Sequence, residues 1–144
     1  PGIAPTYVFL CPLISASSCI PPSETREYFL PKALATDAAT EVLQSQGALG
    51  IFPEGTRSKD CKPKSAKRGI SVIARAAKAD VLPVSIYTET DMSKGVKLTV
   101  RFGELIPYEK LGIGGDDCTK QDLSDAANLV MAEIVKLWEA GHCK

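Results

Sequence analysis

The chain has 144 residues, which is the length of one domain, and 44% of them are hydrophobic, so a buried core can form. Its 17 basic and 17 acidic residues balance, so the net charge indicates no class of partner. Five scattered cysteines and a single histidine, without a C-x-x-C pair, argue against a disulfide framework and a zinc site. We therefore expect a reducing compartment, no metal and no cofactor.

The N-terminal segment is apolar and carries no charged residue before Glu24. Pro5 and Pro12 interrupt it, so it is a poor match to a membrane-spanning helix, and it lacks the basic start of a signal peptide. Three interpretations stay open for residues 1–25: a buried strand with a loop, a segment at a bilayer interface, or sequence unrelated to the native fold. We favour the strand.

Apolar periodicity predicts the remaining elements. A helix over 32–46 ends at Gly47, and the short apolar run that follows is typical of a buried strand in a parallel sheet. In chain order we predict a helix over 32–46, a strand over 48–52, a helix over 67–78, strands over 81–87 and 96–102, and a helix over 120–140. This alternation predicts an α/β fold in three layers, with a mixed, largely parallel sheet flanked by helices.

Three details of the second half are specific enough to test. Residues 96–102 alternate apolar and polar side chains, which predicts a half-exposed strand near the sheet edge. Thr119 and Asp122 have the spacing of a capping box at the start of the last helix. Trp138 fits the apolar stripe of that helix, and we favour core packing over anchorage at a membrane interface. The glycine-rich residues 112–117 predict a surface loop.

The most informative cluster of the chain is Glu54-Gly55-Thr56-Arg57, which follows the apolar run over 48–52 after one proline, Pro53. The glycine lets the backbone bend and approach a ligand closely, and the guanidinium offers a planar fork of donors that suits a phosphate. The cluster therefore predicts an anion site in a tight loop at the end of a strand. Glu54 is expected either to accept a hydrogen bond from a ligand hydroxyl or to orient Arg57.

A strongly basic segment follows this cluster. Between residues 57 and 78 there is a single acid, Asp60, and there are eight basic residues: Arg57, Lys59, Lys62, Lys64, Lys67, Arg68, Arg75 and Lys78. Such a field attracts phosphates, CoA or anionic lipid headgroups, although a solvated lysine-rich loop is the plainer interpretation. Nucleic acid is the weaker partner, because few aromatic residues lie nearby for base stacking and no recognised motif accompanies the charge.

The block from Ile51 to Ser58 resembles the F-P-E-G-T-R-S motif of the glycerolipid acyltransferases, the 1-acylglycerol-3-phosphate acyltransferase family. Three further blocks resemble later motifs of that family: Lys67-Arg68-Gly69, Val81–Ile86 and Val100–Glu104. The resemblance covers roughly residues 37–138, whereas residues 1–25 match it poorly. It implies a glycerol-3-phosphate acyltransferase-like fold. It also implies transfer of a fatty acyl group from acyl-CoA or acyl-carrier protein to a lysophospholipid hydroxyl.

The resemblance also implies roles for single residues. Arg57 would bind the phosphate of the acceptor, with Glu54, Gly55 and Thr56 shaping the same loop. Lys67 would add positive potential, although Ala66 departs from the family pattern before it. Arg26 is a weak match to a further arginine of the family. The family's lipid substrates imply a membrane surface as partner and a cytoplasmic location at the inner face of the membrane.

One block of the family is missing from this sequence. The family's general base is the histidine of an H-x-x-x-x-D motif, whereas the single histidine here, His142, has no aspartate after it. We therefore predict no catalytic residue in this chain, which by itself should be nearly inert. We interpret residues 1–144 as a single partial domain that begins after the missing block; the alternative is a degenerate, non-catalytic relative that binds phospholipid or phosphate. No oligomeric state is indicated.

Overall fold

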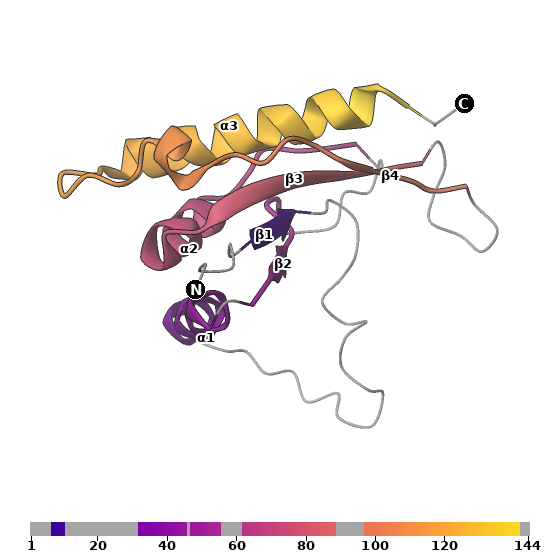
Figure 1. Ribbon diagram of the computed structural model, residues 1–144. Helices are drawn as coiled ribbons and strands as arrows, with labels where there is room; N and C mark the ends of the chain where they lie inside the picture. The colour runs from indigo at the N-terminus through magenta and orange to yellow at the C-terminus, as the bar shows by residue number, and fades with distance from the viewer. Residues whose placement is uncertain (1–6, 11–31, 46, 56–61, 89–96, 142–144) are drawn as a thin grey trace.

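The computed structural model of the chain describes residues 7–10, 32–45, 47–55, 62–88 and 97–141, and of residues 7–10 and 32–35 it describes the backbone. Figure 1 shows how the elements are arranged. In chain order they are β1 (Tyr7–Leu10), α1 (Lys32–Gln44), β2 (Leu49–Ile51), α2 (Gly69–Ala77), β3 (Asp80–Tyr87), β4 (Thr99–Phe102), the short 3-10 helix η2 (Tyr108–Leu111) and α3 (Lys120–Glu139).

The four described strands form one mixed sheet in the order β2-β1-β3-β4. β1 pairs in parallel with both β2 and β3, and β3 pairs antiparallel with β4. Leu10 at the end of β1 lies beside Ile51 on one side and Pro83 on the other. The carboxyl ends of β1 and β2 therefore meet at the same edge of the sheet, which is where ligands bind in open α/β sheets. The predicted mixed α/β class is confirmed.

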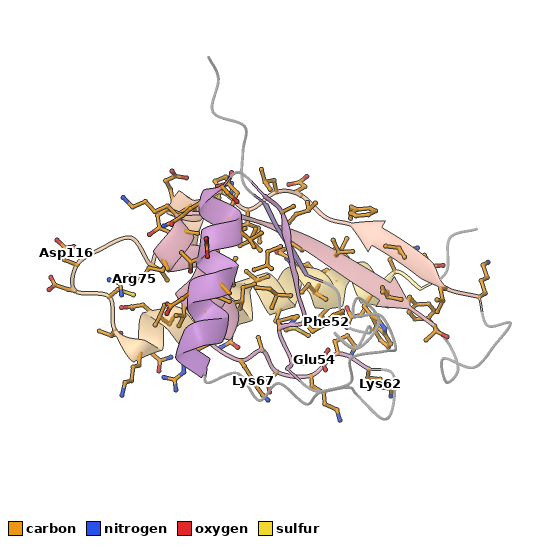
Figure 2. All side chains as sticks on the ribbon, turned by 90° about the horizontal axis from the view of Figure 1, so that it is seen from below. Phe52, Glu54, Lys62, Lys67, Arg75 and Asp116 are labelled. Carbon is orange, nitrogen blue, oxygen red and sulfur yellow. The ribbon has the colours of Figure 1, made fainter. Side chains whose placement is uncertain are left out.

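Helices lie on both faces of this sheet. In Figure 1, α3 lies over one face and α1 and α2 lie on the other, and the rotated view in Figure 2 shows α1 in front of the strands and α3 behind them. The predicted stripe of α3 is present, since Ala127, Val130 and Ile134 are all buried. This apolar packing on both faces is the main source of stability for a domain of this size.

The start of α3 confirms the predicted capping box. The Thr119 hydroxyl accepts a hydrogen bond from the Asp122 backbone N–H at 3.2 Å, and the Asp122 carboxylate accepts one from the Thr119 backbone N–H at 2.7 Å. Two backbone donors of the first turn are thereby satisfied. At the other end of the helix, Trp138 stacks at a tilt on Tyr87 of β3, with ring centroids 5.2 Å apart. Trp138 packs against the sheet, as the core interpretation predicted.

Two helix ends differ slightly from the prediction. α1 ends at Gln44, and the backbone N–H of Gly47 then bonds the Val42 carbonyl at 3.0 Å. A Cβ on Gly47 would lie 2.7 Å from that same oxygen, so the chain needs glycine there. α2 begins at Gly69 rather than at Lys67, with Arg68 as its N-cap: the Arg68 carbonyl accepts a bond from the Val72 backbone N–H at 3.1 Å.

The N-terminal segment provides a strand of the sheet interior. Tyr7–Leu10 lies between β2 and β3 and pairs with both, which agrees with the favoured strand interpretation for these four residues. The remainder of residues 1–25 lies outside the described part of the chain. Within the described residues, no helix combines the length and the apolar character that crossing a bilayer requires.

The strand predicted near the sheet edge is β4, and it does lie at the edge. Its orientation is unusual. The polar Thr99 is buried, whereas the apolar Leu98, Val100 and Phe102 are exposed. The structure therefore turns the apolar side of this strand outward, against the usual pattern for an edge strand with one buried face.

Candidate anion-binding site

The candidate site is built on the tight turn that leaves β2. The backbone N–H of Gly55 donates to the Phe52 carbonyl at 3.1 Å, and Gly55 has φ 65°. This left-handed conformation suits glycine because it lacks a Cβ. The turn stands at the carboxyl edge of the parallel strands, because Ile51 lies beside Leu10 in the sheet.

Glu54 is turned into the protein, with 3% of its surface exposed. Pro53 beside it is also buried, whereas Gly55 is exposed. Burial of a carboxylate is costly unless hydrogen bonds or charges compensate it. Both roles predicted for Glu54, bonding a ligand hydroxyl and orienting Arg57, stay predictions.

Lys67, twelve residues after Gly55 in the chain, contacts this turn in two ways. Its backbone N–H donates to the Pro53 carbonyl at 2.8 Å. Its side chain lies over Gly55, so that a Cβ built on the glycine would be 3.0 Å from Lys67 Cδ and 3.1 Å from Nζ. Figure 2 shows Phe52, Glu54, Lys62 and Lys67 gathered at one side of the molecule. The ammonium of Lys67 therefore lies at the turn.

Thr56 and Arg57, the other two predicted site residues, lie outside the described part of the chain, as does Arg26. The structure does describe the residues on either side of the loop that contains Thr56 and Arg57. Gly55 is the last described residue before it, and the loop returns to Pro53 through the backbone bond from Lys67.

The basic segment divides into two parts in the structure. Lys62, Lys67 and Arg68 are exposed on the loop side, close to the turn or leading from it. Arg75 differs, because its guanidinium donates to the Gly115 carbonyl at 3.0 Å and ties α2 to the glycine-rich loop. Figure 2 places Arg75 and Asp116 away from the labelled residues of the turn. The positive field at the turn therefore comes from the loop residues and not from α2 as a whole.

A family profile described as "Acyltransferase" matches residues 6–87, which is more than half of the 144 residues. The chain belongs to the acyltransferase family. The match begins at residue 6, so it includes β1, for which the sequence alone offered no family motif. It ends with β3 and thus contains the whole β2 turn, Lys67 and α2.

The structure also resembles a solved enzyme, the 1-acyl-sn-glycerophosphate (LPA) acyltransferase PlsC from Thermotoga maritima. The two superpose with a TM-score of 0.63, over 99% of this chain and 70% of that one, at 20% sequence identity. At this identity the likeness establishes the fold. No curated protein sequence matches the chain at a significant level.

Sequence reasoning missed two features of this candidate site. It left open whether Glu54 faces a ligand or the protein, and burial cannot be read from a single loop residue. It also assigned Lys67 only a general positive potential, whereas the structure places its side chain on Gly55. No local sequence pattern signalled this contact; in the structure Gly55 has a positive φ and no Cβ, which leaves space above the backbone that a neighbouring side chain can occupy. Among the described residues, no three His, Cys, Asp or Glu side chains gather as metal ligands would.

Proposed function

We propose that this chain is the phosphate-binding part of a glycerolipid acyltransferase. The complete enzyme would transfer a fatty acyl group from acyl-CoA or acyl-carrier protein to the free hydroxyl of 1-acylglycerol-3-phosphate. Family membership and the fold support acyl transfer, and the Glu54-Gly55-Thr56-Arg57 block at the carboxyl edge of the sheet supports a phosphorylated acceptor. Because both substrates of such an enzyme are acylated, it would work at a membrane surface, at the inner face of the membrane.

The observation that carries this proposal is the contact of Lys67 with Gly55. It brings an ammonium to a turn whose next two residues are Thr56 and Arg57. Two cations and a hydroxyl close to an exposed glycine backbone form a donor set suited to a phosphate monoester. Arg57 would supply the planar fork and Lys67 a mobile point charge. Glu54, which is buried behind the turn, would orient the donors.

In the proposed reaction, this chain binds the acceptor phosphate, and the general base belongs to a group outside this chain. In the complete reaction, a general base takes the proton of the acceptor hydroxyl, the hydroxyl oxygen attacks the thioester carbonyl, and the thiol of CoA or of the carrier protein leaves. The site proposed here holds the acceptor phosphate and so fixes the distance between hydroxyl and base. Such positioning can lower the activation barrier by several kcal/mol, and by about 7 kcal/mol when the orientation is good. We assign no catalytic residue to this chain, which we regard as a single partial domain.

A second candidate function is non-catalytic binding of phospholipid or phosphate. One observation favours it: the sequence holds a single histidine, His142, and no aspartate follows it. A chain of this kind would keep the anion loop and lose turnover. Both candidates predict the same binding site, so the site residues do not separate them.

An acyl-transfer assay separates the two candidates when it is combined with the upstream gene sequence. The partial-domain proposal expects an H-x-x-x-x-D motif encoded upstream and turnover by the extended protein, with almost none by residues 1–144. The binding proposal expects affinity for lysophosphatidate without turnover in either form. Robust turnover by residues 1–144 alone would contradict both.

A further inference from the structure

The first turn of α2 presents backbone donors that no described group uses. The first hydrogen bond of the helix runs from the Val72 N–H to the Arg68 carbonyl at 3.1 Å. The N–H groups of Gly69, Ile70 and Ser71 come before it, and within the described part of the chain none of the three has an acceptor. The N-cap residue, Arg68, makes no side-chain cap either. Free N–H groups at the positive end of a helix dipole are a site at which proteins bind phosphate.

A buried hydroxyl in the same turn also lacks a partner. Ser71 is 2% exposed, and its Oγ atom has no hydrogen-bond partner among the described residues. Ser71 is the third residue of α2, and helical side chains tilt toward the helix N-terminus, so its hydroxyl is directed at the start of the helix. A buried hydroxyl without a partner is destabilising, and this one therefore indicates a bonded group that the described chain does not supply.

The start of α2 is open to an incoming anion, and the nearby charges favour one. Gly69 is exposed, and a Cβ built on it would meet nothing within 4 Å. The first turn of α2 holds no acidic side chain, and Lys67 and Arg68, both exposed, directly precede the helix. Residues 62–79 as a whole hold six basic residues and no carboxylate. An anion at Gly69 would therefore enter a positive field without repulsion from this segment.

The start of α2 also adjoins the candidate anion site. Lys67 comes two residues before Gly69, its backbone N–H donates to the Pro53 carbonyl at 2.8 Å, and its side chain lies over Gly55. The lysine thus connects the turn that leaves β2 to the first turn of α2. Open α/β sheets commonly bind phosphates where a loop after a strand meets a helix N-terminus in this way.

We infer that the first turn of α2 binds the phosphate group of a substrate, through the N–H groups of Gly69, Ile70 and Ser71 and the Ser71 hydroxyl. The inference deepens the proposed function and rests on it for the compounds that reach this edge of the sheet. The lysophospholipid acceptor and CoA both carry a phosphate monoester that such a donor set accommodates. On binding, the Ser71 hydroxyl would gain the acceptor that it lacks in the free protein.

Amide chemical shifts of ¹⁵N-labelled protein test the site with inorganic phosphate as the probe. Phosphate should shift the resonances of residues 69–71, and chloride at equal ionic strength should not. The start of α3 is the internal control, because the Thr119 and Asp122 N–H groups are already bonded within the capping box. Absence of a phosphate-dependent shift at residues 69–71, or equal shifts at the start of α3, would overturn the inference.

Ser71→Ala separates a ligand-binding role from a purely structural one. Removal of the unpaired hydroxyl should raise the urea midpoint of the free protein and weaken phosphate binding about tenfold, because a hydrogen bond to a charged group contributes roughly that factor. Ser85→Ala is the matched control: Ser85 is also fully buried and, among the described residues, unpaired, but it lies on β3. It should leave phosphate binding unchanged. Equal phosphate affinity of Ser71→Ala and wild type would show that the hydroxyl does not serve the ligand.

A charge placed at the start of the helix gives a second test. Gly69→Glu should weaken phosphate binding at least about tenfold, because its carboxylate would occupy the positive end of the helix dipole and repel the ligand. Gly69→Gln has nearly the same shape without the charge, and the open space at Gly69 admits both side chains. Gln should bind phosphate within about twofold of wild type. Equal affinity of the two variants would contradict an anion site here.

Titrations with CoA and with monomeric short-chain lysophosphatidate identify the source of the phosphate. The compound whose affinity falls in both Ser71→Ala and Gly69→Glu is the one that places its phosphate at α2, and no fall for either compound would overturn the inference. The proposed function is tested separately, by lysophosphatidate binding that Arg57→Ala abolishes. That result with unchanged affinities in the α2 variants would leave the proposed function standing alone, whereas CoA binding at α2 without any lysophosphatidate binding would leave the α2 site standing alone.

Discussion

The Nζ atom of Lys67 lies 3.1 Å from the position that a Cβ would take on Gly55. The lysine side chain thus fills the space that a side chain at residue 55 would need. Since the backbone of Lys67 is also bonded to Pro53, both ends of the loop that carries Arg57 are fastened to each other. This closure gives the anion loop a defined base on the sheet.

Replacement of Gly55 by alanine should lower the free energy of unfolding by about 1–2 kcal/mol, because a non-glycine residue is strained at positive φ. It should also displace the Lys67 side chain and so weaken phosphate binding. Urea denaturation measures the first effect. Gly50→Ala is the matched control, since a Cβ there meets nothing within 4 Å. Equal stability of Gly55→Ala and wild type would show that the turn relaxes freely.

The capping box of α3 should make stability depend on pH in the acid range. Hydrogen bonds from the backbone and hydroxyl of Thr119 lower the pKa of Asp122 from its ordinary value of 3.8. A lowered folded-state pKa means that the stabilisation is fully present well above the ordinary value of 3.8 and is lost as the pH falls through the folded-state pKa. Asp122→Asn should flatten this part of a plot of unfolding free energy against pH.

Removal of the Thr119 hydroxyl tests the same box at neutral pH. Thr119→Ala should cost about 1 kcal/mol of unfolding free energy, whereas Thr119→Ser should cost little, because serine caps as well as threonine does. Thermal denaturation of the three proteins measures the difference. Should alanine and serine variants be equally stable, the hydroxyl would contribute nothing to the helix start.

These elements show which parts of the fold the sequence determines locally. Thr119 and Asp122 lie three residues apart, so their pairing follows from helix geometry alone and was predicted correctly. The edge position of β4 was also predicted, since alternation of side chains indicates a half-exposed strand. The sequence did not predict which face of β4 is exposed. The burial of Thr99 depends on α3, which begins about twenty residues later in the chain.

The same limit applies to the candidate site. The anion block at residues 54–57 is visible in the sequence because its four residues are consecutive. The placement of Lys67 on Gly55 depends on the path of the intervening loop, and no local pattern encodes it. The burial of Glu54 depends on neighbours from other elements, so its orientation needed the fold.

Ser85 offers a test of the packing between β3 and α3. Its hydroxyl is fully buried, and within the described residues it has no hydrogen-bond partner. A buried hydroxyl without a partner costs about 1–3 kcal/mol, so Ser85→Ala should raise the free energy of unfolding, by up to about 1 kcal/mol once the lost packing is counted. Ser124→Ala, which removes a hydroxyl that donates to the Lys120 carbonyl, should change stability by less than about 0.5 kcal/mol. A large loss in Ser85→Ala would reveal a partner for this hydroxyl.

The central claim is that cations at the β2 turn hold an anionic glycerolipid, and isothermal titration with monomeric short-chain lysophosphatidate measures it most directly. Arg57→Ala should weaken binding at least about tenfold and Lys67→Ala somewhat less, since each charge-assisted hydrogen bond is worth about 1.5–3 kcal/mol and 1.4 kcal/mol is a factor of ten. Arg75→Ala, whose guanidinium is bonded to the glycine-rich loop, should bind as wild type does. The account predicts wild-type binding that the phosphate-free monoacylglycerol cannot match. Equal affinity of wild type and Arg57→Ala for lysophosphatidate would contradict it.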